Sequence, residues 1–249
     1  AVLDGGDFFD LKSPGRTPHS LMRRIFETHR THDTCPVYAN VGNHDCVYGD
    51  YSYLHQQPLG VLFESGVFRR LYDEHEAVFT QDGVTVRVVG VPYHGTVYDM
   101  DRFARIKKGQ EDFLVVMAHL LASPTKTSMF ESEDVIRYDT LDAFDGDIFN
   151  FGHWHKNQGV SLTPGGKVIV NIGSLTRGSL SEDDLDRVPS VAILRFERGR
   201  APLVEIVPVD HRPASEVFDL VKHETMQLRE QMLDKFSETL AAILAVRTG

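Results

Sequence analysis

Gly152-His153-Trp154-His155 stands between an apolar run, Asp147-Ile148-Phe149-Asn150-Phe151, and a polar turn, Lys156-Asn157-Gln158-Gly159. A short run rich in isoleucine and phenylalanine and bounded by glycines is typical of a buried strand, so both histidines are expected on the loop after its carboxyl end. That edge is where α/β sheets carry their functional groups. Two histidines one residue apart can direct both rings into one small volume, which suits a metal ion or a phosphate. Taken alone, the pair fits two surface-loop histidines equally well.

Three other apolar runs end in residues of the same chemical kind. Ala1-Val2-Leu3 precedes Gly5-Gly6-Asp7-Phe8-Phe9-Asp10, residues 36–41 precede Gly42-Asn43-His44-Asp45, and residues 113–117 precede Ala118-His119. Each pattern predicts a strand whose end delivers a carboxylate, an amide or an imidazole. These ligand types together suit divalent ions such as Mn²⁺, Fe²⁺ or Zn²⁺, and the lack of thiolates argues against a structural zinc site.

In this order the motifs resemble those of the calcineurin-like metallophosphoesterase superfamily, which run GDxxD, GNH(D/E), (G)H and GHxH. The resemblance extends from residue 4 to residue 155. It implies an α/β fold in which a β-sandwich of two mixed sheets is flanked by helices. It also implies two divalent ions, Mn²⁺ foremost with Fe²⁺ or Zn²⁺ as alternatives, that clamp a phosphate and activate a water for in-line attack.

The resemblance assigns a metal-binding role to five residues. Asp7 corresponds to the carboxylate that bridges both ions. Asn43, His119 and His153 correspond to ligands of the second ion, and His155 to a ligand of the first. The family's Asp-x-His motif, which supplies further ligands of the first ion, does not precede Asp7 in this sequence. We expect that an N-terminal segment is omitted, because the first residues begin inside a strand pattern; the alternative is a lost first site.

Three more residues are implied near the substrate. His44 resembles the catalytic histidine that protonates the leaving oxygen or stabilises its developing charge. Asp45 would orient His44, although an aspartate here can also stabilise the turn. Asp10, the last residue of GDxxD, corresponds to a supporting position beside the substrate.

Within the superfamily, the chain resembles the nuclease subunit of SbcCD-type double-strand-break repair complexes. The resemblance to this nuclease subunit rests on Gly6-Asp7-Phe8-Phe9-Asp10, the GNHD motif and Asn171-Ile172-Gly173-Ser174-Leu175-Thr176-Arg177. The resemblance implies an exonuclease or endonuclease of DNA repair or recombination, a homodimer and an SbcC-type ATPase partner. Arg177 and the polar loop 120–132 would hold the DNA backbone. Two alternatives stay open: a small-molecule phosphatase or cyclic-nucleotide phosphodiesterase, and a non-catalytic scaffold.

Composition sets the broad class. The chain has 249 residues, of which 41% are hydrophobic and 25% charged, as in ordinary globular proteins. The formal net charge of −10 argues against general adhesion to nucleic acid, although bound divalent ions would add local positive charge. No apolar run reaches the length of about 18 residues that a membrane span needs. The two cysteines, Cys35 and Cys46, offer no disulfide framework, which favours a reducing, cytoplasmic location.

The remaining patterns predict how the chain is divided. We expect a metallophosphoesterase domain over residues 1–210 and a helical extension over 211–249. A helix should start with Thr17 as N-cap and Pro18 as its first residue, and others should cover 54–64, 100–107 and about 215–246. Hairpins should turn at Asp82-Gly83 and at 164–166, and strands are expected at 191–196 and 203–209. The resemblance to SbcD-type nucleases implies self-association through the first helix and the segment after Tyr51; the alternative is that their apolar faces are buried within the domain. The apolar stripe of the last helix should pack on the main domain, with a partner site as the alternative.

Overall fold

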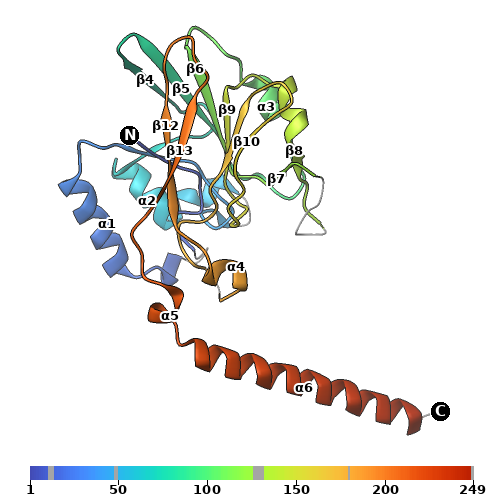
Figure 1. The fold of residues 1–249 in the computed structure, drawn as a ribbon. Coiled ribbons are helices and arrows are strands. Elements are labelled where there is room, and N and C mark those ends of the chain that lie inside the picture. The colour runs from blue at the N-terminus through green and yellow to red at the C-terminus, as the bar shows by residue number, and fades with distance from the viewer. Residues whose placement is uncertain (11–13, 48–49, 126–131, 179, 248–249) are drawn as a thin grey trace. The chain divides into compact units, whose positions relative to one another are not determined.

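The computed structural model describes residues 1–10, 14–47, 50–125, 132–178 and 180–247. The chain forms two compact units (Figure 1). The first consists of Ala1–Leu175 and Ser190–Val207, and the second of Thr176–Pro189 and Pro208–Gly249. The first unit contains several sheets flanked by helices, which confirms the predicted α/β fold class, although only the larger of its two main sheets is mixed. The expected boundary at 210/211 lies within the second unit, which also takes up Thr176–Pro189.

A six-stranded mixed sheet forms the centre of the first unit, in the order β10-β11-β9-β6-β5-β4. The four inner strands run parallel, and β4 and β10 pair antiparallel at the two edges. Every residue of the central strand β6 is buried, as expected for a parallel strand covered on both faces. Both predicted hairpins are present, and Asp82 and Gly83 have φ of 50° and 76°, as a type I′ turn requires. The strands are β4 (Glu76–Gln81), β5 (Val84–Val91), β6 (Phe113–Ala118), β9 (Ile148–Phe151), β10 (Gly159–Leu162) and β11 (Val168–Asn171).

Two smaller sheets cover one face of this sheet. The first is parallel and contains β1 (Val2–Asp4), β2 (Val37–Ala39) and β3 (Phe68–Arg70), of which β3 was not predicted from the sequence. The second pairs β12 (Ser190–Arg195) with β13 (Leu203–Pro208). One apolar cluster joins Tyr38 of β2, Val115 of β6 and Ala192 of β12. This shared core makes the first unit a sandwich of sheets.

Helices α1 (His19–Thr31) and α2 (Pro58–Glu64) contribute Met22 and Leu62 to a second cluster with Ala39 of β2, so they cover the outer face of the three-stranded sheet. The predicted start of the first helix is corrected. Pro18 is the N-cap, with an extended ψ of 134°, and no side chain caps the helix, so Thr17 lies outside it.

The helix predicted over 54–64 is interrupted. The 3₁₀ helix η3 (Tyr51–Gln56) ends before Gln57, whose φ of −97° and ψ of 155° are extended, and Pro58 then begins α2. The residue before a proline is driven out of the helical region by the proline ring, which explains the break.

A third cluster covers the opposite face of the six-stranded sheet. It contains Phe103 of α3 (Asp101–Arg105), Leu141 of the 3₁₀ helix η4 (Tyr138–Ala143) and Phe149 of β9. Helix α3 is shorter than the predicted 100–107. Two residues each of β7 (Ala122–Ser123) and β8 (Ile136–Arg137) pair in parallel here. Residues 126–131 of the predicted substrate loop lie outside the described residues.

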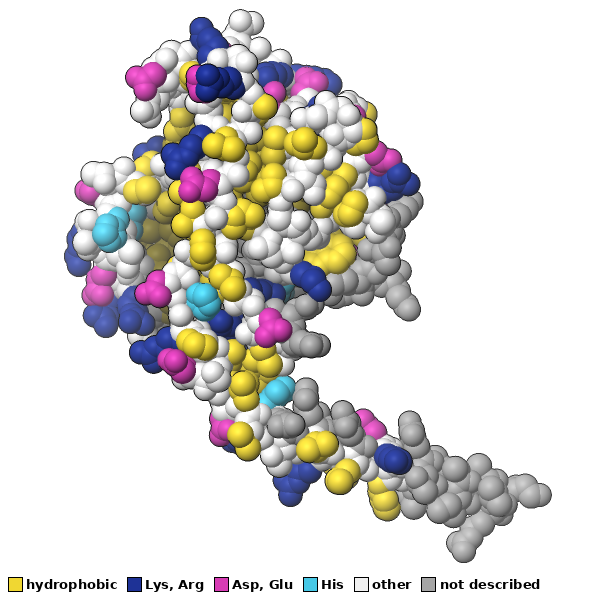
Figure 2. All heavy atoms as spheres, viewed as in Figure 1, with side chains coloured by type: hydrophobic (Ala, Val, Ile, Leu, Met, Phe, Trp, Pro, Cys, Tyr) yellow, Lys and Arg dark blue, Asp and Glu magenta, His cyan; other side chains and the backbone are white. Residues whose placement is uncertain are grey.

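The outer face of the β12–β13 pair is apolar as well. Hydrophobic side chains gather on this face in Figure 2, and Val191, Ile193 and Leu203 are between 37% and 60% exposed. Strand β12 alternates, with Ala192 and Leu194 turned into the core. One face of the two-stranded sheet therefore covers the core, while the apolar side chains on its other face are exposed.

The second unit is helical. It contains α4 (Glu182–Leu185), α5 (Ala214–Val217) and α6 (Leu220–Arg247), so the helix predicted over 215–246 is broken near Phe218. Val221, Met232 and Phe236 of α6 are exposed, so this unit itself does not bury them, and their packing on the main domain stays a prediction. Among the described residues, no helix combines the length and apolar character needed to cross a membrane.

Candidate metal centre

The predicted motif residues converge where strands of both sheets end. Asp7 and Asn43 follow β1 and β2 of the three-stranded sheet, while His119 and His153 follow β6 and β9 of the six-stranded sheet. Beneath them, the buried amide of Asn40 ties the sheets together, because its Nδ2 donates to the carbonyls of Val91 (3.0 Å) and Met117 (3.1 Å). This cross-sheet link was not predicted, since Asn40 lies outside the motifs.

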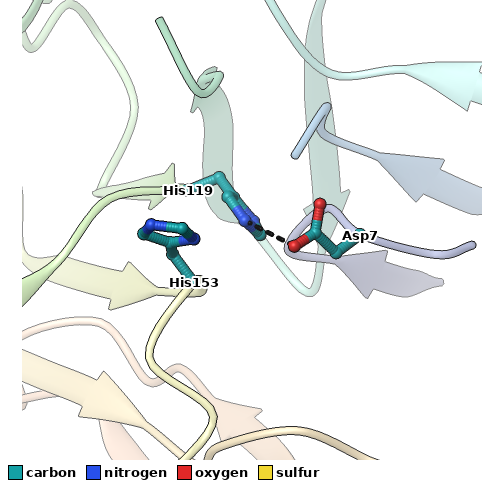
Figure 3. A group of neighbouring side chains, drawn as sticks. All are labelled: Asp7, His119 and His153. Carbon is teal, nitrogen blue, oxygen red and sulfur yellow. Dashed lines mark ion pairs between the residues drawn. The ribbon is translucent and has the colours of Figure 1, made fainter. Parts of the chain in front are cut away.

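Asp7, His119 and His153 form the centre of the site (Figure 3). One ligand atom from each lies within 4.8 Å of the others, as binding of a single ion requires. Asp7 Oδ2 is 3.1 Å from His119 Nε2. His119 is 1% exposed, whereas Asp7 and His153 are partly exposed, so the group is open to solvent on the side of these two residues.

The environment of His119 fits a cation. Its Nδ1 lies 2.9 Å from the carbonyl of Gly5, which can only accept, so Nδ1 carries a hydrogen. In the neutral ring, Nε2 then presents a lone pair toward Asp7 Oδ2 and toward Asn43 Oδ1, which is 3.3 Å away. Asp7 Oδ2 is also buried and receives no hydrogen bond from the described residues. Three electron-pair donors thus face one point, which requires a cation or a proton there.

The titration behaviour agrees with that geometry. Burial lowers the pKa of His119, but the charge of Asp7, the hydrogen bond to Asp7 and the hydrogen bond to the Gly5 carbonyl together raise it overall. Burial likewise opposes the charge on Asp7, yet His119 and the N–H of His44 lower the pKa of Asp7 to about 2. For His153, burial and the charge of His119 lower the pKa, which keeps the ring neutral and available as a ligand. The ionised carboxylate of Asp7 and the neutral ring of His153 both offer electron pairs to a cation at this point.

Asp7 and His153 both adopt left-handed backbone conformations, with φ of 60° and 72°. Non-glycine residues rarely do so, and such conformations persist where the surrounding structure holds them. At Asp7 the backbone N–H donates to Asp45 Oδ2 (2.7 Å), and Oδ1 accepts the N–H of His44 (2.7 Å). The first motif is therefore held against the second by its own ligand residue.

The glycine of the second motif permits this approach. A Cβ on Gly42 would lie 2.0 Å from Asp7 Oδ1 and 2.5 Å from Asp7 N, well inside contact distance. Only glycine lets the two loops meet here without displacement.

Asp45 holds the loops together. Its carboxylate is 2% exposed and accepts N–H groups of Asp7 (2.7 Å), Gly42 (3.0 Å) and Phe9 (3.4 Å). The ring of His44 is instead held by Asp10, whose carbonyl lies 2.6 Å from His44 Nδ1. The orienting contact predicted for Asp45 is thus made by the Asp10 backbone, and the turn-stabilising alternative describes Asp45. Because a carbonyl only accepts, Nδ1 of His44 carries a hydrogen, and Nε2 is left for proton transfer.

Two residues that sequence reasoning missed contact His153. Glu133 Oε1 lies 3.0 Å from His153 Nε2 and 2.8 Å from the hydroxyl of Tyr98. The centroid of the Tyr93 ring lies 5.2 Å from the centroid of the His153 ring and 6.4 Å from that of the His119 ring. None of these residues belongs to a motif, and a glutamate in a polar loop carries no sequence signal of its own.

Two predicted site residues lie outside the centre. His155 is exposed and does not belong to the group formed by Asp7, His119 and His153, and its backbone carbonyl accepts the N–H of Ser174. The guanidinium of Arg177, in the second unit, donates to the carbonyls of Arg212 (2.9 Å) and Arg187 (3.1 Å). Two of its five N–H groups thus donate to the chain itself, and the expected contact with a DNA backbone stays a prediction.

Residues 1–157 match the sequence profile of the family described as calcineurin-like phosphoesterase. The match covers all four motifs and the centre built from them. The chain belongs to the calcineurin-like phosphoesterase family. Membership indicates metal-dependent hydrolysis of phosphoesters, and Asp7, Asn43, His119 and His153 are the residues that would hold a divalent ion here.

Comparison with other proteins adds little to this assignment. No curated protein sequence matches the chain. A hypothetical protein from Thermus thermophilus is 16% identical, with a TM-score of 0.38, over 76% of this chain and 94% of its own. A Thermotoga maritima protein is 15% identical, with a TM-score of 0.29, over 78% and 90%. Vps29 from Entamoeba histolytica, solved with Zn²⁺, is 16% identical, with a TM-score of 0.30, over 83% and 97%. At these TM-scores the similarities carry no argument about function.

Proposed function

We propose that this calcineurin-like phosphoesterase hydrolyses phosphodiester bonds of DNA with the help of bound divalent ions, Mn²⁺ in preference to Mg²⁺. The observation that carries the hydrolytic part is the convergence of Asp7 Oδ2, Asn43 Oδ1 and the rings of His119 and His153. Imidazole and carboxylate together favour a borderline transition metal over Mg²⁺, which prefers oxygen ligands and keeps its waters.

The chain's own residues supply the remaining chemistry. When bound, divalent ions neutralise phosphate charge and make a water nucleophilic at neutral pH. His44 stands beside the centre, fastened by its N–H to Asp7 and by Nδ1 to the Asp10 carbonyl. As water attacks phosphorus and gives up one proton to the solvent, the bond to the leaving oxygen breaks. His44, entering the step as the imidazolium, donates its Nε2 proton to that oxygen and is left neutral with its hydrogen on Nδ1. Asp10 acts through its backbone carbonyl, which holds the Nδ1 hydrogen and so leaves Nε2 as the nitrogen that donates.

DNA as the substrate is supported by the sequence resemblance to SbcD-type nucleases, including Gly173-Ser174-Leu175. Arg177 stays a proposed contact to the DNA backbone, alongside the two bonds that its guanidinium donates to carbonyls of the chain. The formal net charge of −10 favours the competing substrate class, small phosphate esters, which need no basic groove. A homodimer, an SbcC-type ATPase partner and a role in DNA repair are proposed on the same resemblance.

The deciding experiment compares four substrates in Mn²⁺ and in EDTA: labelled single-stranded DNA, labelled double-stranded DNA, bis-p-nitrophenyl phosphate and p-nitrophenyl phosphate. We expect DNA and the small diester to be cleaved with Mn²⁺, less with Mg²⁺, and not with chelator. DNA cleavage should also weaken as salt rises, because phosphate contacts release counterions.

A matched pair of variants identifies the site responsible. His153→Ala should abolish cleavage, whereas His19→Ala, at the exposed start of α1, should not change it. Rapid hydrolysis of the monoester with intact DNA would replace the nuclease proposal by a phosphatase. Full activity in EDTA after dialysis would refute metal dependence, and no hydrolysis of any substrate despite Mn²⁺ binding would favour a non-catalytic scaffold.

A further inference from the structure

Glu133 is a buried carboxylate that is hydrogen-bonded to His153, a proposed metal ligand. The side chain of Glu133 is 7% exposed and that of His153 is 9% exposed. Burying a carboxylate is costly unless hydrogen bonds replace its lost water. Oε1 of Glu133 receives two such bonds, from Nε2 of His153 (3.0 Å) and from the hydroxyl of Tyr98 (2.8 Å).

The direction of each hydrogen bond follows from its partners. The Tyr98 hydroxyl accepts the N–H of Leu121 (3.0 Å), so its own hydrogen points to Glu133. A carboxylate oxygen can only accept, so Oε1 takes one hydrogen from Tyr98 and a second from His153, and Nε2 of His153 is the protonated nitrogen. In the neutral ring the lone pair then belongs to Nδ1. Figure 3 shows the His153 ring turned toward His119 and Asp7, where that lone pair is needed.

Further hydrogen bonds join the loop that carries Tyr98 to the loop that carries Glu133, and none of them involves a metal ion. The N–H of Tyr98 donates to Asp134 Oδ2 (2.9 Å), and the N–H of Asp134 donates to the carbonyl of Thr96 (2.8 Å). Tyr98 itself is 8% exposed. The loop that carries Tyr98 and the loop that carries Glu133 are thus joined to each other as well as to His153.

Glu133 acts on the centre through His153. It is not a member of the described group whose ligand atoms lie within 4.8 Å of one another. Metal-binding histidines commonly donate their second ring N–H to a carboxylate, which fixes the tautomer and makes the ligand nitrogen more basic.

We propose that Glu133, supported by Tyr98, is a positioning residue that holds His153 as the Nε2–H tautomer with Nδ1 directed at the metal centre. This inference rests on the proposed metal dependence. It adds two residues, outside every motif, on which the affinity for the ion depends.

The test measures Mn²⁺ affinity by titration calorimetry. Loss of such an outer partner typically lowers metal affinity by about 10–100-fold, and we expect that loss for Glu133→Ala. Glu133→Gln keeps an oxygen that can accept from both partners but removes the charge, so its loss should be smaller, and Tyr98→Phe should fall between wild type and Glu133→Ala. Glu74→Ala and Tyr53→Phe, both at exposed positions, serve as matched controls and should bind as wild type does.

A second measurement does not need the ion. Long-range ¹H–¹⁵N correlation spectra of the metal-free protein report which nitrogen of each histidine is protonated. His153 should be the Nε2–H tautomer in the unsubstituted protein and a mixture in Glu133→Ala. Unchanged Mn²⁺ affinity together with an unchanged tautomer in a folded Glu133→Ala variant would overturn the inference. If Glu133→Ala does not fold, a Glu133→Gln variant that binds Mn²⁺ as tightly as the unsubstituted protein overturns it. If the unsubstituted protein binds no Mn²⁺, the proposed metal dependence fails first, and this inference fails with it.

Discussion

Removal of the Asp45 carboxylate should destabilise the protein far more than removal of an exposed aspartate. Asp45→Ala deletes the acceptor of two short bonds, from Asp7 N (2.7 Å) and Gly42 N (3.0 Å), and of a long one from Phe9 N (3.4 Å). Leaving a buried donor unsatisfied costs about 1–3 kcal/mol. Counting only the two short bonds, we expect the free energy of unfolding to fall by about 2–6 kcal/mol, a large part of the stability of a typical domain.

Asp45→Asn refines the prediction. Both short bonds end on Oδ2, so the single carbonyl oxygen of asparagine can accept both. Burial, helped by the charge of Asp7, raises the pKa of Asp45 to about 7, so the neutral acid that asparagine resembles is already accessible near neutral pH. We therefore expect Asp45→Asn to cost only about 1 kcal/mol, the size of one ordinary hydrogen bond.

The assay is urea unfolding of the metal-free protein in EDTA, followed by far-ultraviolet circular dichroism. Asp33→Ala, at an exposed position, is the control and should change the free energy of unfolding by less than about 0.5 kcal/mol. If Asp45→Ala costs less than about 1 kcal/mol, or no more than Asp45→Asn, the assignment of Asp45 as the link between the two loops is wrong.

Three further predictions concern the centre and the assembly. His44→Ala should keep its bound metal but lose about 10²–10⁴-fold in turnover, whereas His153→Ala should lose both, as elemental analysis and diester hydrolysis would show; equal metal loss in the two variants would contradict the role of His44. Gly42→Ala should lower the free energy of unfolding by about 1–3 kcal/mol and weaken Mn²⁺ binding, because its Cβ would sit 2.0 Å from Asp7 Oδ1, while Gly15→Ala, with nothing within 4 Å, should do neither in the same unfolding and calorimetric measurements. The proposed self-association through α1 predicts a dimeric mass by light scattering at micromolar concentration, and a monomeric mass would count against it.

Much of the sandwich could be predicted because its signals are local. The apolar runs at 113–117 and 147–151 are too short for helices and end in glycine or alanine followed by histidine. The Asp82-Gly83 hairpin follows from turn chemistry, since few residues tolerate positive φ at both positions. Strand β3, only Phe68–Arg70, was missed because three residues have no measurable period and are defined by pairing with β2.

Expectations from the sequence differed from the structure where backbone geometry, and not residue composition, determines the local conformation. The helix expected over 54–64 breaks because the ring of Pro58 drives Gln57 out of the helical region. The carbonyls that accept from the guanidinium of Arg177 belong to residues 187 and 212, which are distant in sequence. Such contacts between backbone and side chain leave no trace in the sequence.

Local patterns in the chain indicate which residue types stand at the ends of which strands, and hence that Asp7, Asn43, His119 and His153 belong to one family pattern. Parallel strands must end at the same edge of a sheet, so neighbouring motifs are brought close. The protonation and orientation of those groups depend instead on tertiary contacts. Glu133 selects the tautomer of His153, the Asp10 carbonyl that of His44, and Asp45 aligns the loops. These partners are chosen by buried hydrogen-bond geometry between segments far apart in the chain, which no local pattern encodes.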